Sequence, residues 1–538
     1  MTRLVGWGRD REGQSAIDLQ VWDVIYETIL RCKGNMVIPG TFVFSDEPAV
    51  RLAGRRGLII SQHHCEILGT NTFRWPKDEE FSFVRNRRAV EAAWQNSVVT
   101  YGDQEMIWTV GYRGLTDRAF WFDDPGVAET DAERGKVISD AIARQVEIVK
   151  KFRKDPIIIW NAWDEGVALW EAGHLMIPEG ITVVWPDRRG GLMRDKGRVK
   201  SGQGAYVHPA FFNDTANHLS EAVPVDRFAR ELTRYDGVGA TEYLLLNVSC
   251  IRPNLLTTKA VMDMGWRIDD WRAQPVERSQ TYYQQWNAAQ FGETVAAEMT
   301  GYWEALFVAP AAFGEDECDV VADQVYHTVT AAICRRALQD ELEQQPLWWP
   351  LSLFPHEGMG PKLGFIESIT ADAMPRWEAL YDHAKRARSS VPAERADFFT
   401  GHILASLAVG RQGNRMLHAL ARAAQRIIAG DTDGALVLVE EALQAAEETR
   451  VALKRAEYGK WTGFYEYSWF TNYQRSIAIL RALRAQLKGE WAGDAVFVHH
   501  RTYTVSEALS YYQKGRFVQT EPLNEFGEGI DNYQRWQL

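Results

Sequence analysis

The sequence predicts an α/β fold: a TIM (β/α)8 barrel over residues 1–275, followed by an α-helical bundle over residues 276–490. In the first half of the chain, short apolar runs alternate with amphipathic helical patterns, which is typical of parallel βαβ units. Eight such units within about 265 residues match the size of a TIM barrel. From Pro275 onward, apolar residues recur at helical spacing instead, which favours a bundle.

The predicted strands come first along the chain. They are Leu4–Asp10, Asn35–Gly40, Leu58–His64, Met106–Gly114, Ile157–Glu165, Ile181–Arg188, Gly204–Phe212 and Glu242–Cys250. Helical patterns between them cover Ala16–Arg31, Ala132–Lys150 and Val225–Arg234. A doubly wound open sheet is the alternative arrangement, but no GxGxxG motif follows any of these strands.

The second half is predicted to be helical, and the last 48 residues are harder to interpret. The helical patterns cover Gln285–Leu306, Val320–Leu342, Ile366–Ala387, Phe398–Gly430, Thr432–Glu457 and Tyr473–Leu487. Residues 491–538 are interpreted as a C-terminal tail or arm. Its aromatic residues and Arg516 fit packing on its own barrel or on a second subunit, so a homodimer stays open.

Composition narrows the classes of function. The net charge of −12 argues against a nucleic-acid binder, and no apolar run approaches the roughly 18 residues of a membrane span. The five cysteines show no CxxC spacing and the N-terminus has no signal-peptide pattern, so we expect a reduced, cytoplasmic protein without a metal or another cofactor. The 21 Trp residues are numerous, and tryptophan often forms the wall of a sugar pocket.

Polar side chains gather where the predicted strands end. Because the active site of a TIM barrel lies at the C-terminal ends of its strands, these residues are expected to converge on one face. They include Glu12, His64, Arg113, Asp117, Trp163, Glu165, Trp185, Asp187, Arg188, Tyr206, His208 and Asn247. A lone Asp at a strand end is more often a helix cap, so the prediction depends on the whole set and on the barrel itself.

Three of these residues carry carboxyl groups that are suited to glycoside hydrolysis. In that reaction one carboxyl group protonates the leaving oxygen and another activates water or attacks directly. Asp117, Glu165 and Asp187 are the candidates, and Arg113 and Arg188 fit recognition of an anionic sugar. A structural salt bridge to a nearby acid is an equally good interpretation of either arginine.

The chain resembles glycoside hydrolase family 115, the xylan α-1,2-glucuronidases, through motifs that follow one another in the same order. The family's RGN-x-x-x-P, SHHE and GxRGDGD segments are similar to Lys33–Pro39, Gln62–Glu66 and Gly111–Asp117. Its Y-K-E-V, W-A-D-D-N and G-x-Y-Y-H segments are similar to Trp163–Gly166, Trp185–Arg189 and Gly204–His208. Its V-N-V-G-D-L-K-P, Q-F-G and G-K-W-N segments are similar to Leu246–Pro253, Gln290–Gly292 and Gly459–Thr462. The resemblance covers about residues 1–490. Leu115 and Arg188 stand where the family carries acids, and the outer domains of typical members have no counterpart here.

The resemblance implies an inverting, exo-acting hydrolase that removes terminal α-linked glucuronic acid or its 4-O-methyl ether from xylan-type or related oligosaccharides. It implies that Asp117 is the general acid and that Glu165 or Asp187 holds the attacking water. Tyr206 and His208 would contact the sugar, and Asn247 would lie at the last strand end. The alternatives are a glycosidase of the same fold with another sugar specificity and a barrel that binds carbohydrate without catalysis.

Overall fold

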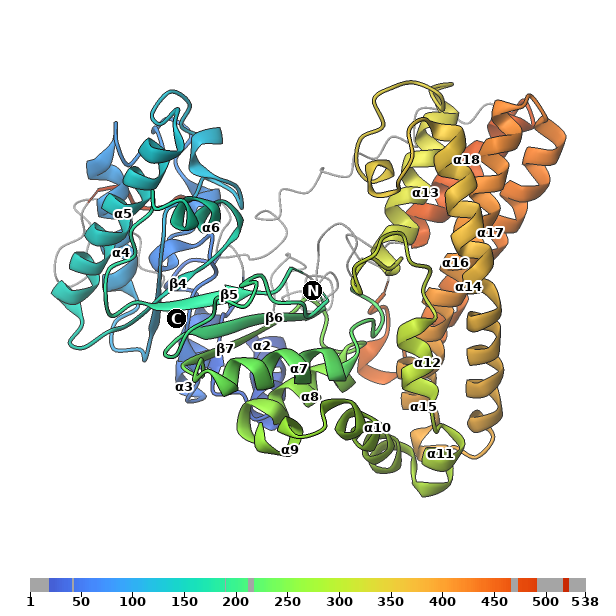
Figure 1. Cartoon of the computed structure of the whole chain (residues 1–538), viewed down its shortest axis with the longest axis horizontal. Helices are drawn as coiled ribbons and strands as arrows, with labels where there is room; N and C mark the ends of the chain where they lie inside the picture. Colours follow the sequence, from blue (N-terminus) through green and yellow to red (C-terminus); the bar gives the residue numbers. More distant parts are fainter. Residues whose placement is uncertain are drawn as a thin grey trace.

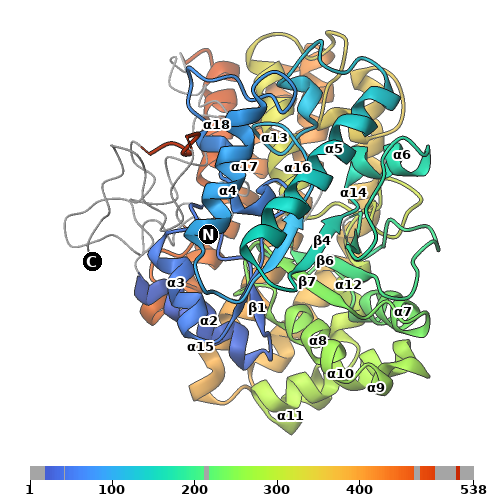
Figure 2. The ribbon, with the colours of Figure 1, turned by 90° about the vertical axis from the view of Figure 1, so that its left-hand side faces the viewer.

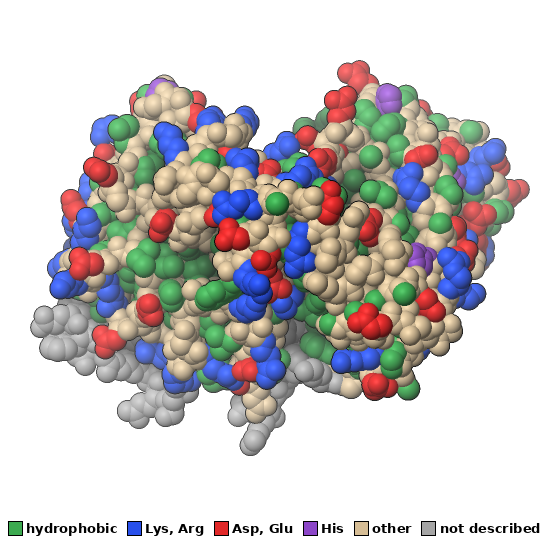
Figure 3. Space-filling view, turned by 60° about the horizontal axis from the view of Figure 1, so that its bottom comes forward, with side chains coloured by type: hydrophobic (Ala, Val, Ile, Leu, Met, Phe, Trp, Pro, Cys, Tyr) green, Lys and Arg blue, Asp and Glu red, His purple; other side chains and the backbone are tan. Residues whose placement is uncertain are grey.

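The computed structural model describes residues 19–40, 43–188, 190–210, 217–465, 473–490 and 516–521. An α/β part, blue to green in Figure 1, stands beside a helical part that is yellow to orange. Helices α10 and α11 connect the two parts, and Figure 3 shows them as two lobes with a notch between them. Over the described part of the face in Figure 3, positive and negative side chains are interspersed.

Seven parallel strands follow one another through the α/β part. They are β1 Met36–Val37, β2 Ile59–Ile60, β3 Ile107–Val110, β4 Ile157–Asn161, β5 Thr182–Pro186, β6 Gly204–Ala210 and β7 Tyr243–Val248. Strands β3 to β7 pair in sequence order, β1 pairs with β2, and a parallel bridge from Ile60 to Met106 joins the two sheets. The first predicted strand, Leu4–Asp10, lies outside the described residues. The result is a curled parallel sheet, and its closure into a full eight-stranded barrel stays a prediction.

Helices cover this sheet in the alternating order that the sequence predicts (Figure 2). They are α2 Leu19–Arg31, α3 Pro48–Arg55, α4 Arg87–Thr100, α5 Asp131–Phe152, α6 Asp164–Glu171, α7 Val225–Gly237, α8 Leu255–Trp266 and α9 Asp269–Arg272, with 3₁₀ turns η1 Ile67–Gly69, η2 Thr72–Arg74 and η3 Phe120–Phe122. Helix α5 begins at a capping box in which Thr130 and Glu133 satisfy each other's backbone N–H groups.

Several predicted strands are longer than the observed ones: Leu58–His64 contains only Ile59–Ile60, and Met106–Gly114 contains only Ile107–Val110. The predicted strand Ile157–Glu165 ends at Asn161, and helix α6 begins at Asp164 with Trp163 as its N-cap. Asp164 and Glu165 occupy the first turn of α6, where the positive end of the helix dipole favours carboxylates. These two acids therefore follow helical geometry and do not alternate across a strand.

The second half is helical, as predicted, but its first helical pattern is interrupted. The helices are α10 Pro275–Phe291, α11 Glu293–Glu298, α12 Tyr302–Val308, α13 Asp323–Leu338, α14 Met359–Arg388, α15 Ala396–Phe399, the π-helix η6 Thr400–Leu404, α16 Ala405–Ile428, α17 Thr432–Arg455 and α18 Tyr473–Leu487, with short turns η4 Leu351–Leu353, η5 Ala393–Arg395 and η7 Gly459–Trp461. The predicted helix Gln285–Leu306 is broken because Gly292 and Gly301 have φ values of 93° and 77°, which a continuous helix does not allow.

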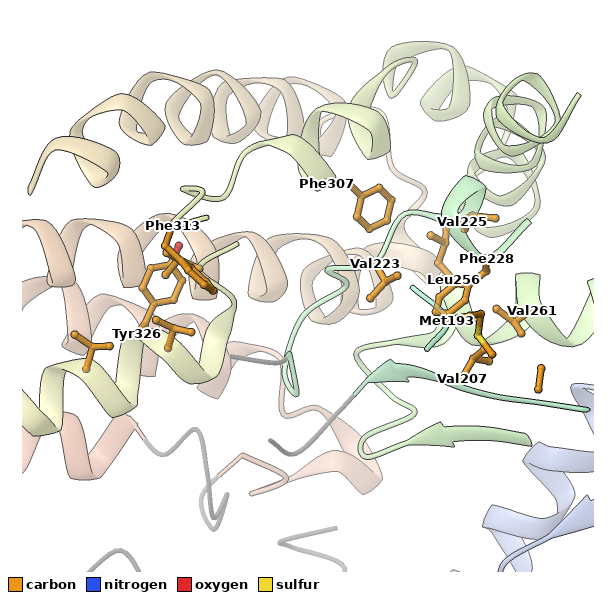
Figure 4. Packing of buried hydrophobic residues seen from close by; sticks show 14 of the residues in the cluster. Met193, Val207, Val223, Val225, Phe228, Leu256, Val261, Phe307, Phe313 and Tyr326 are labelled. Atoms are coloured by element: carbon orange, nitrogen blue, oxygen red, sulfur yellow. The ribbon is translucent and has the colours of Figure 1, made fainter. Parts of the chain in front are cut away.

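A continuous hydrophobic core joins the two parts. Figure 4 shows Val207 and Phe228 of the α/β part, with Phe307, Phe313 and Tyr326 of the helical part, and all five belong to one cluster of buried side chains. Among the described residues, the helices lack the combination of length and apolar character that crossing a bilayer requires. All five cysteines are free, as the sequence predicts.

Candidate active site

The loops that follow β2, β3 and β4 bring four of the predicted residues into contact. Nε2 of His64 lies 3.0 Å from Oδ1 of Asp117. Arg113 donates through Nε and Nη2 to the two carboxylate oxygens of Glu165, at 2.6 and 3.3 Å. Its Nη1 donates to Asp117. One arginine therefore holds two carboxyl groups, and His64 contacts one of them.

The charges around Asp117 favour its ionised form. Burial by itself would raise the pKa of Asp117, but the hydrogen bond with His64 and the charge of Arg113 outweigh it and hold this pKa well below its usual range. Burial lowers the pKa of His64, although the neighbouring Asp117 carboxylate acts in the opposite direction. The side chain of Asp117 is 45% exposed, whereas that of Arg113 is 10% exposed. Asp117 is thus an accessible carboxylate that the less exposed side chains of Arg113 and His64 hold in place.

An aromatic wall lies next to these charges. The rings of Trp163 and His64 are stacked, with centroids 4.0 Å apart and planes 15° apart. Tyr206 lies 5.9 Å from Trp163 and 4.5 Å from His208, ring centre to ring centre. Nδ2 of Asn247 donates to the hydroxyl of Tyr206 at 3.0 Å. Side chains that follow β2 and β4 and side chains within β6 and β7 therefore form one cluster of aromatic rings and polar edges.

Asp187 lies behind this wall. Its side chain is completely buried, and its Oδ1 accepts a hydrogen bond from Nδ1 of His208 at 2.5 Å. Its Oδ2 accepts the backbone N–H groups of Gly191 and His208, both at 3.0 Å. The contacts orient the His208 ring, which is what a positioning carboxylate does beside an imidazole.

Three predicted residues lie apart from this cluster or outside the described residues. The indole of Trp185 is buried, donates to Oε1 of Gln203 at 2.9 Å and packs against Trp170. Arg188 forms an ion pair with Asp316 of the helical part, with 2.8 Å between Nη1 and Oδ2. Glu12 lies outside the described residues. Arg188 thus forms the structural salt bridge that is its alternative interpretation, and Trp185 is a buried packing residue.

The sequence reasoning missed Arg194. Its guanidinium lies 5.0 Å from the centre of the Trp163 ring, forms an ion pair with Asp164 and donates from Nε to the backbone carbonyl of Asp187 at 3.0 Å. The residue follows the β5 end by several positions, in a turn whose path no motif indicates. The cluster therefore contains a second arginine beside Trp163, in addition to Arg113.

One group of potential metal ligands occurs within the described ranges, but it lies away from this cluster. Asp316, Cys318 and Asp319 belong to a loop of the helical part. Arg188 pairs with Asp316, so a positive charge already occupies one of the carboxylates. The strand-end cluster combines carboxylates, arginines, imidazoles and an aromatic wall, which are the groups needed to bind a sugar and transfer protons to and from it.

Comparison with known proteins identifies the family of the chain and a similar fold. The sequence model described as glycosyl hydrolase family 115 matches residues 2–311, more than half of the chain. A structure described as a family GH115 4-O-methyl-alpha-glucuronidase, BtGH115A, with specificity for decorated arabinogalactans, has a TM-score of 0.62 and 18% identity. The alignment covers 86% of this chain and 59% of that one.

Two further results complete the comparison. A structure described as a GH138 enzyme targeting pectin rhamnogalacturonan II has a TM-score of 0.47 and 10% identity, over 91% of this chain and 80% of that one. No curated protein sequence matches the chain. Because the family match spans more than half of the chain, and because a structure of the same family shares its fold, the chain belongs to glycosyl hydrolase family 115.

Proposed function

We propose that the chain is an exo-acting, inverting glycoside hydrolase that removes terminal α-linked glucuronic acid or its 4-O-methyl ether from an oligosaccharide. The observation that carries this proposal is the position of Arg113 between Glu165 and Asp117. Hydrolysis needs two carboxyl groups, and a uronic acid needs a cation for its own carboxylate. A single arginine at the meeting point of both groups supplies that cation.

Arg113 retains the capacity to bind a sugar carboxylate. A guanidinium has five N–H donors, and three of them are used in the described contacts with Glu165 and Asp117. The remaining two N–H groups, one on each terminal nitrogen, suit a carboxylate of the substrate. The positive charge also offsets the repulsion between an anionic sugar and two acidic side chains. A neutral sugar would use neither property.

We assign Asp117 as the general base and Glu165 as the general acid. The low pKa of Asp117 keeps this carboxyl group ionised, as a general base must be at the start of the reaction, and it disfavours a group that must enter the reaction protonated. This assignment reverses the role that the family resemblance implies for Asp117. Trp163 forms the aromatic surface against which the sugar ring stacks, the buried Tyr206 ring packs beside Trp163, and Asp187 orients His208.

Two classes of aglycone are compatible with the proposal, so the test uses both. The neighbouring structure is described as specific for decorated arabinogalactans, whereas the resemblance in the sequence motifs is to xylan glucuronidases. Aldouronic xylo-oligosaccharides and glucuronylated arabinogalactan fragments are therefore assayed side by side, together with neutral aryl glycosides. Turnover of neutral glycosides alone would favour the alternative sugar specificity, and saturable binding without any product would favour a non-catalytic barrel.

Two variants separate the acid from the base. Glu165→Gln is expected to lose most activity on natural glycosides but to recover it on a uronide with a very acidic phenol as leaving group, because that phenol leaves without protonation. Asp117→Asn is expected to stay inactive on both substrates, since water still lacks its base. The reverse pattern would assign the roles the other way, and wild-type turnover in both variants would remove both residues from the mechanism.

The fold forms part of the same proposal. Seven parallel strands in chain order support a complete (β/α)8 barrel, and the helices after residue 275 support a bundle as a second domain. In such a barrel, the cluster at the strand ends lies at the usual position of the active site.

A further inference from the structure

A short segment near the C-terminal end of the chain packs on the α/β part, far in sequence from its contacts. Residues 516–521, called the strap here, lie against α4 and the loops that follow β1 and β2 (Figure 2). Val518 and Thr520 are buried, whereas Phe517 and Glu521 are exposed. This alternation is that of an extended chain with one face against the protein.

The strap has specific contacts along its length. Arg516 donates from Nη2 to both carboxylate oxygens of Asp46, at 2.9 and 3.0 Å, and its guanidinium lies 4.2 Å from the centre of the Phe44 ring. The amide of Asn96 donates to the carbonyls of Gln519 and Glu521, at 2.8 and 2.7 Å. The strap is therefore held by an ion pair, a contact between a guanidinium and an aromatic ring, and two hydrogen bonds to main-chain carbonyls.

One series of contacts leads from the strap to His64. Arg516 contacts Phe44 and Asp46, which lie in the loop after β1. In the same loop, the backbone N–H of Val43 donates to Oε1 of Glu66 at 3.1 Å. The backbone N–H of Glu66 in turn donates to the carbonyl of His63 at 2.9 Å. The turn that carries His64 is therefore braced by the loop that the strap holds.

A second series leads to Asp117. The backbone N–H of Val518 donates to the carbonyl of Arg74 at 2.8 Å, at the end of the 3₁₀ turn η2. At the start of that turn, Oγ1 of Thr72 donates to the carbonyl of Leu115 at 3.2 Å. Leu115 lies two residues before Asp117 in the turn that also contains Arg113. Both members of the His64–Asp117 pair thus belong to turns that connect back to the strap.

We propose that the strap is a positioning element, which holds the loops after β1 and β2 so that His64 and Asp117 stay within hydrogen-bonding distance. The strap acts on this pair through Glu66 on one side and Thr72 on the other. Small displacements of reacting groups reduce rates strongly, so loosening these loops lowers the rate of the chemical step more than substrate binding. The kinetic part of this inference rests on the proposed hydrolase function.

The test compares Arg516→Ala with a matched control. Arg411 in the helical part donates to Oε2 of Glu378 at 2.9 and 2.7 Å and lies 4.2 Å from the centre of the Tyr381 ring. Its side chain is 15% exposed and that of Arg516 is 19% exposed, so Arg411→Ala removes an equivalent set of contacts away from the strap. Amide hydrogen exchange, followed by mass spectrometry on the full chain, reports on the loops in both variants.

We expect Arg516→Ala to speed exchange in residues 43–47, 61–74 and 111–118, and Arg411→Ala to leave these peptides unchanged. In the hydrolase assay, Arg516→Ala is expected to lower kcat about tenfold with KM changed less than about twofold. Arg516→Lys, which keeps the ion pair, is expected to recover most of the rate. Thr520→Val removes only the bond of 2.6 Å to Glu79 and is expected to act in the same direction if Arg516→Ala folds poorly.

Unchanged exchange in all three loops, in both Arg516→Ala and Thr520→Val, would overturn the inference. A loss of kcat equal in Arg516→Ala and Arg411→Ala would also overturn it, because the effect would then be a general loss of stability. If the wild-type chain hydrolyses none of the uronides, the proposed function fails. The exchange measurement then still decides whether the strap holds the loops.

Discussion

His64 and Asp117 are 53 residues apart in the chain, yet Nε2 of the imidazole and Oδ1 of the carboxylate lie 3.0 Å apart at the ends of neighbouring strands. The surroundings act on the pKa values of these two residues through different causes. Burial lowers the pKa of His64, whereas His64 and Arg113 hold the pKa of Asp117 well below its usual range. An imidazole in hydrogen-bonding contact with an exposed carboxylate is an arrangement suited to holding and deprotonating a water molecule.

Replacing Arg113 tests the recognition of an anionic sugar. Arg113→Lys keeps one positive charge but loses the fork that contacts Glu165 and Asp117. We expect KM for uronides to rise about tenfold or more, in line with the loss of charge-assisted bonds. Arg144→Lys is the control, because Arg144 also bridges two carboxylates, those of Glu91 and Glu147, on helices of the α/β part. Equal KM values in the two variants would remove Arg113 from substrate binding.

Replacing Trp163 is expected to reduce activity, whereas replacing Trp185 is expected to reduce stability. Trp163→Ala removes the ring that stacks on His64, so kcat/KM should fall while thermal stability changes little. Trp185→Ala removes a buried indole and its bond to Gln203, and is expected to cost about 3–5 kcal/mol of stability. Thermal unfolding and steady-state kinetics of both variants check this. A stable but inactive Trp185→Ala protein would place Trp185 at the site after all.

Arg188 is predicted to have a minor role. It pairs with Asp316 across the junction of the two parts, and both side chains are about half exposed, 48% and 49%. Exposed ion pairs contribute about 0–1 kcal/mol, so Arg188→Ala should change stability little and leave kcat/KM within about twofold of wild type. A large increase in KM for uronides, without an increase for neutral glycosides, would instead make Arg188 a substrate contact.

The free energy of unfolding should depend on pH through Glu221, a buried acid whose carboxyl group contacts the first turn of α8. It accepts the N–H groups of Leu256 and Thr257 and the Thr257 hydroxyl, but burial outweighs these bonds and raises the pKa of Glu221 to about 7. Between pH 4.5 and 7 the folded chain binds the proton more tightly than the unfolded chain does. The contribution of Glu221 to the free energy of unfolding therefore decreases as the pH rises.

Over this range the decrease amounts to about 3 kcal/mol for a shift of this size. Urea titrations at pH 4.5 and pH 7.5 measure it as the difference between wild type and Glu221→Gln, which has no proton to lose. Exposed Glu394→Gln is the control and is expected to leave the difference unchanged. The same pH dependence in wild type and Glu221→Gln would contradict the raised pKa.

Much of the α/β part could be predicted because its strands are apolar and their ends are marked by polar residues. Arg113 and Glu165 follow such strands and Tyr206 lies within one, so their convergence follows from a parallel sheet. The sequence does not distinguish Trp163 from Trp185, since each stands next to an acid. The structure separates them because Trp163 caps a helix at the strand end, whereas Trp185 lies within β5 and packs on Trp170.

Contacts between residues far apart in the chain could not be predicted from the sequence. Arg188 directly follows Asp187 in the chain, but its ion pair is with Asp316, 128 residues away. The strap packs on the α/β part, one of the two placements that the sequence leaves open, but no periodicity or motif indicates its contact with Asn96 across more than 400 residues. Side-chain pairing over such separations depends on the packing of the whole chain.

The release of free uronic acid tests the central claim most directly. Wild type and Glu165→Gln are incubated with oligosaccharides that carry terminal 4-O-methylglucuronic acid, and proton NMR follows the products over time. We expect the wild-type chain to release the free uronic acid, with the β anomer appearing first, and Glu165→Gln to release it at least about a hundredfold more slowly. Absence of any uronic acid with the wild-type chain, or equal release by both proteins, would contradict the proposed function.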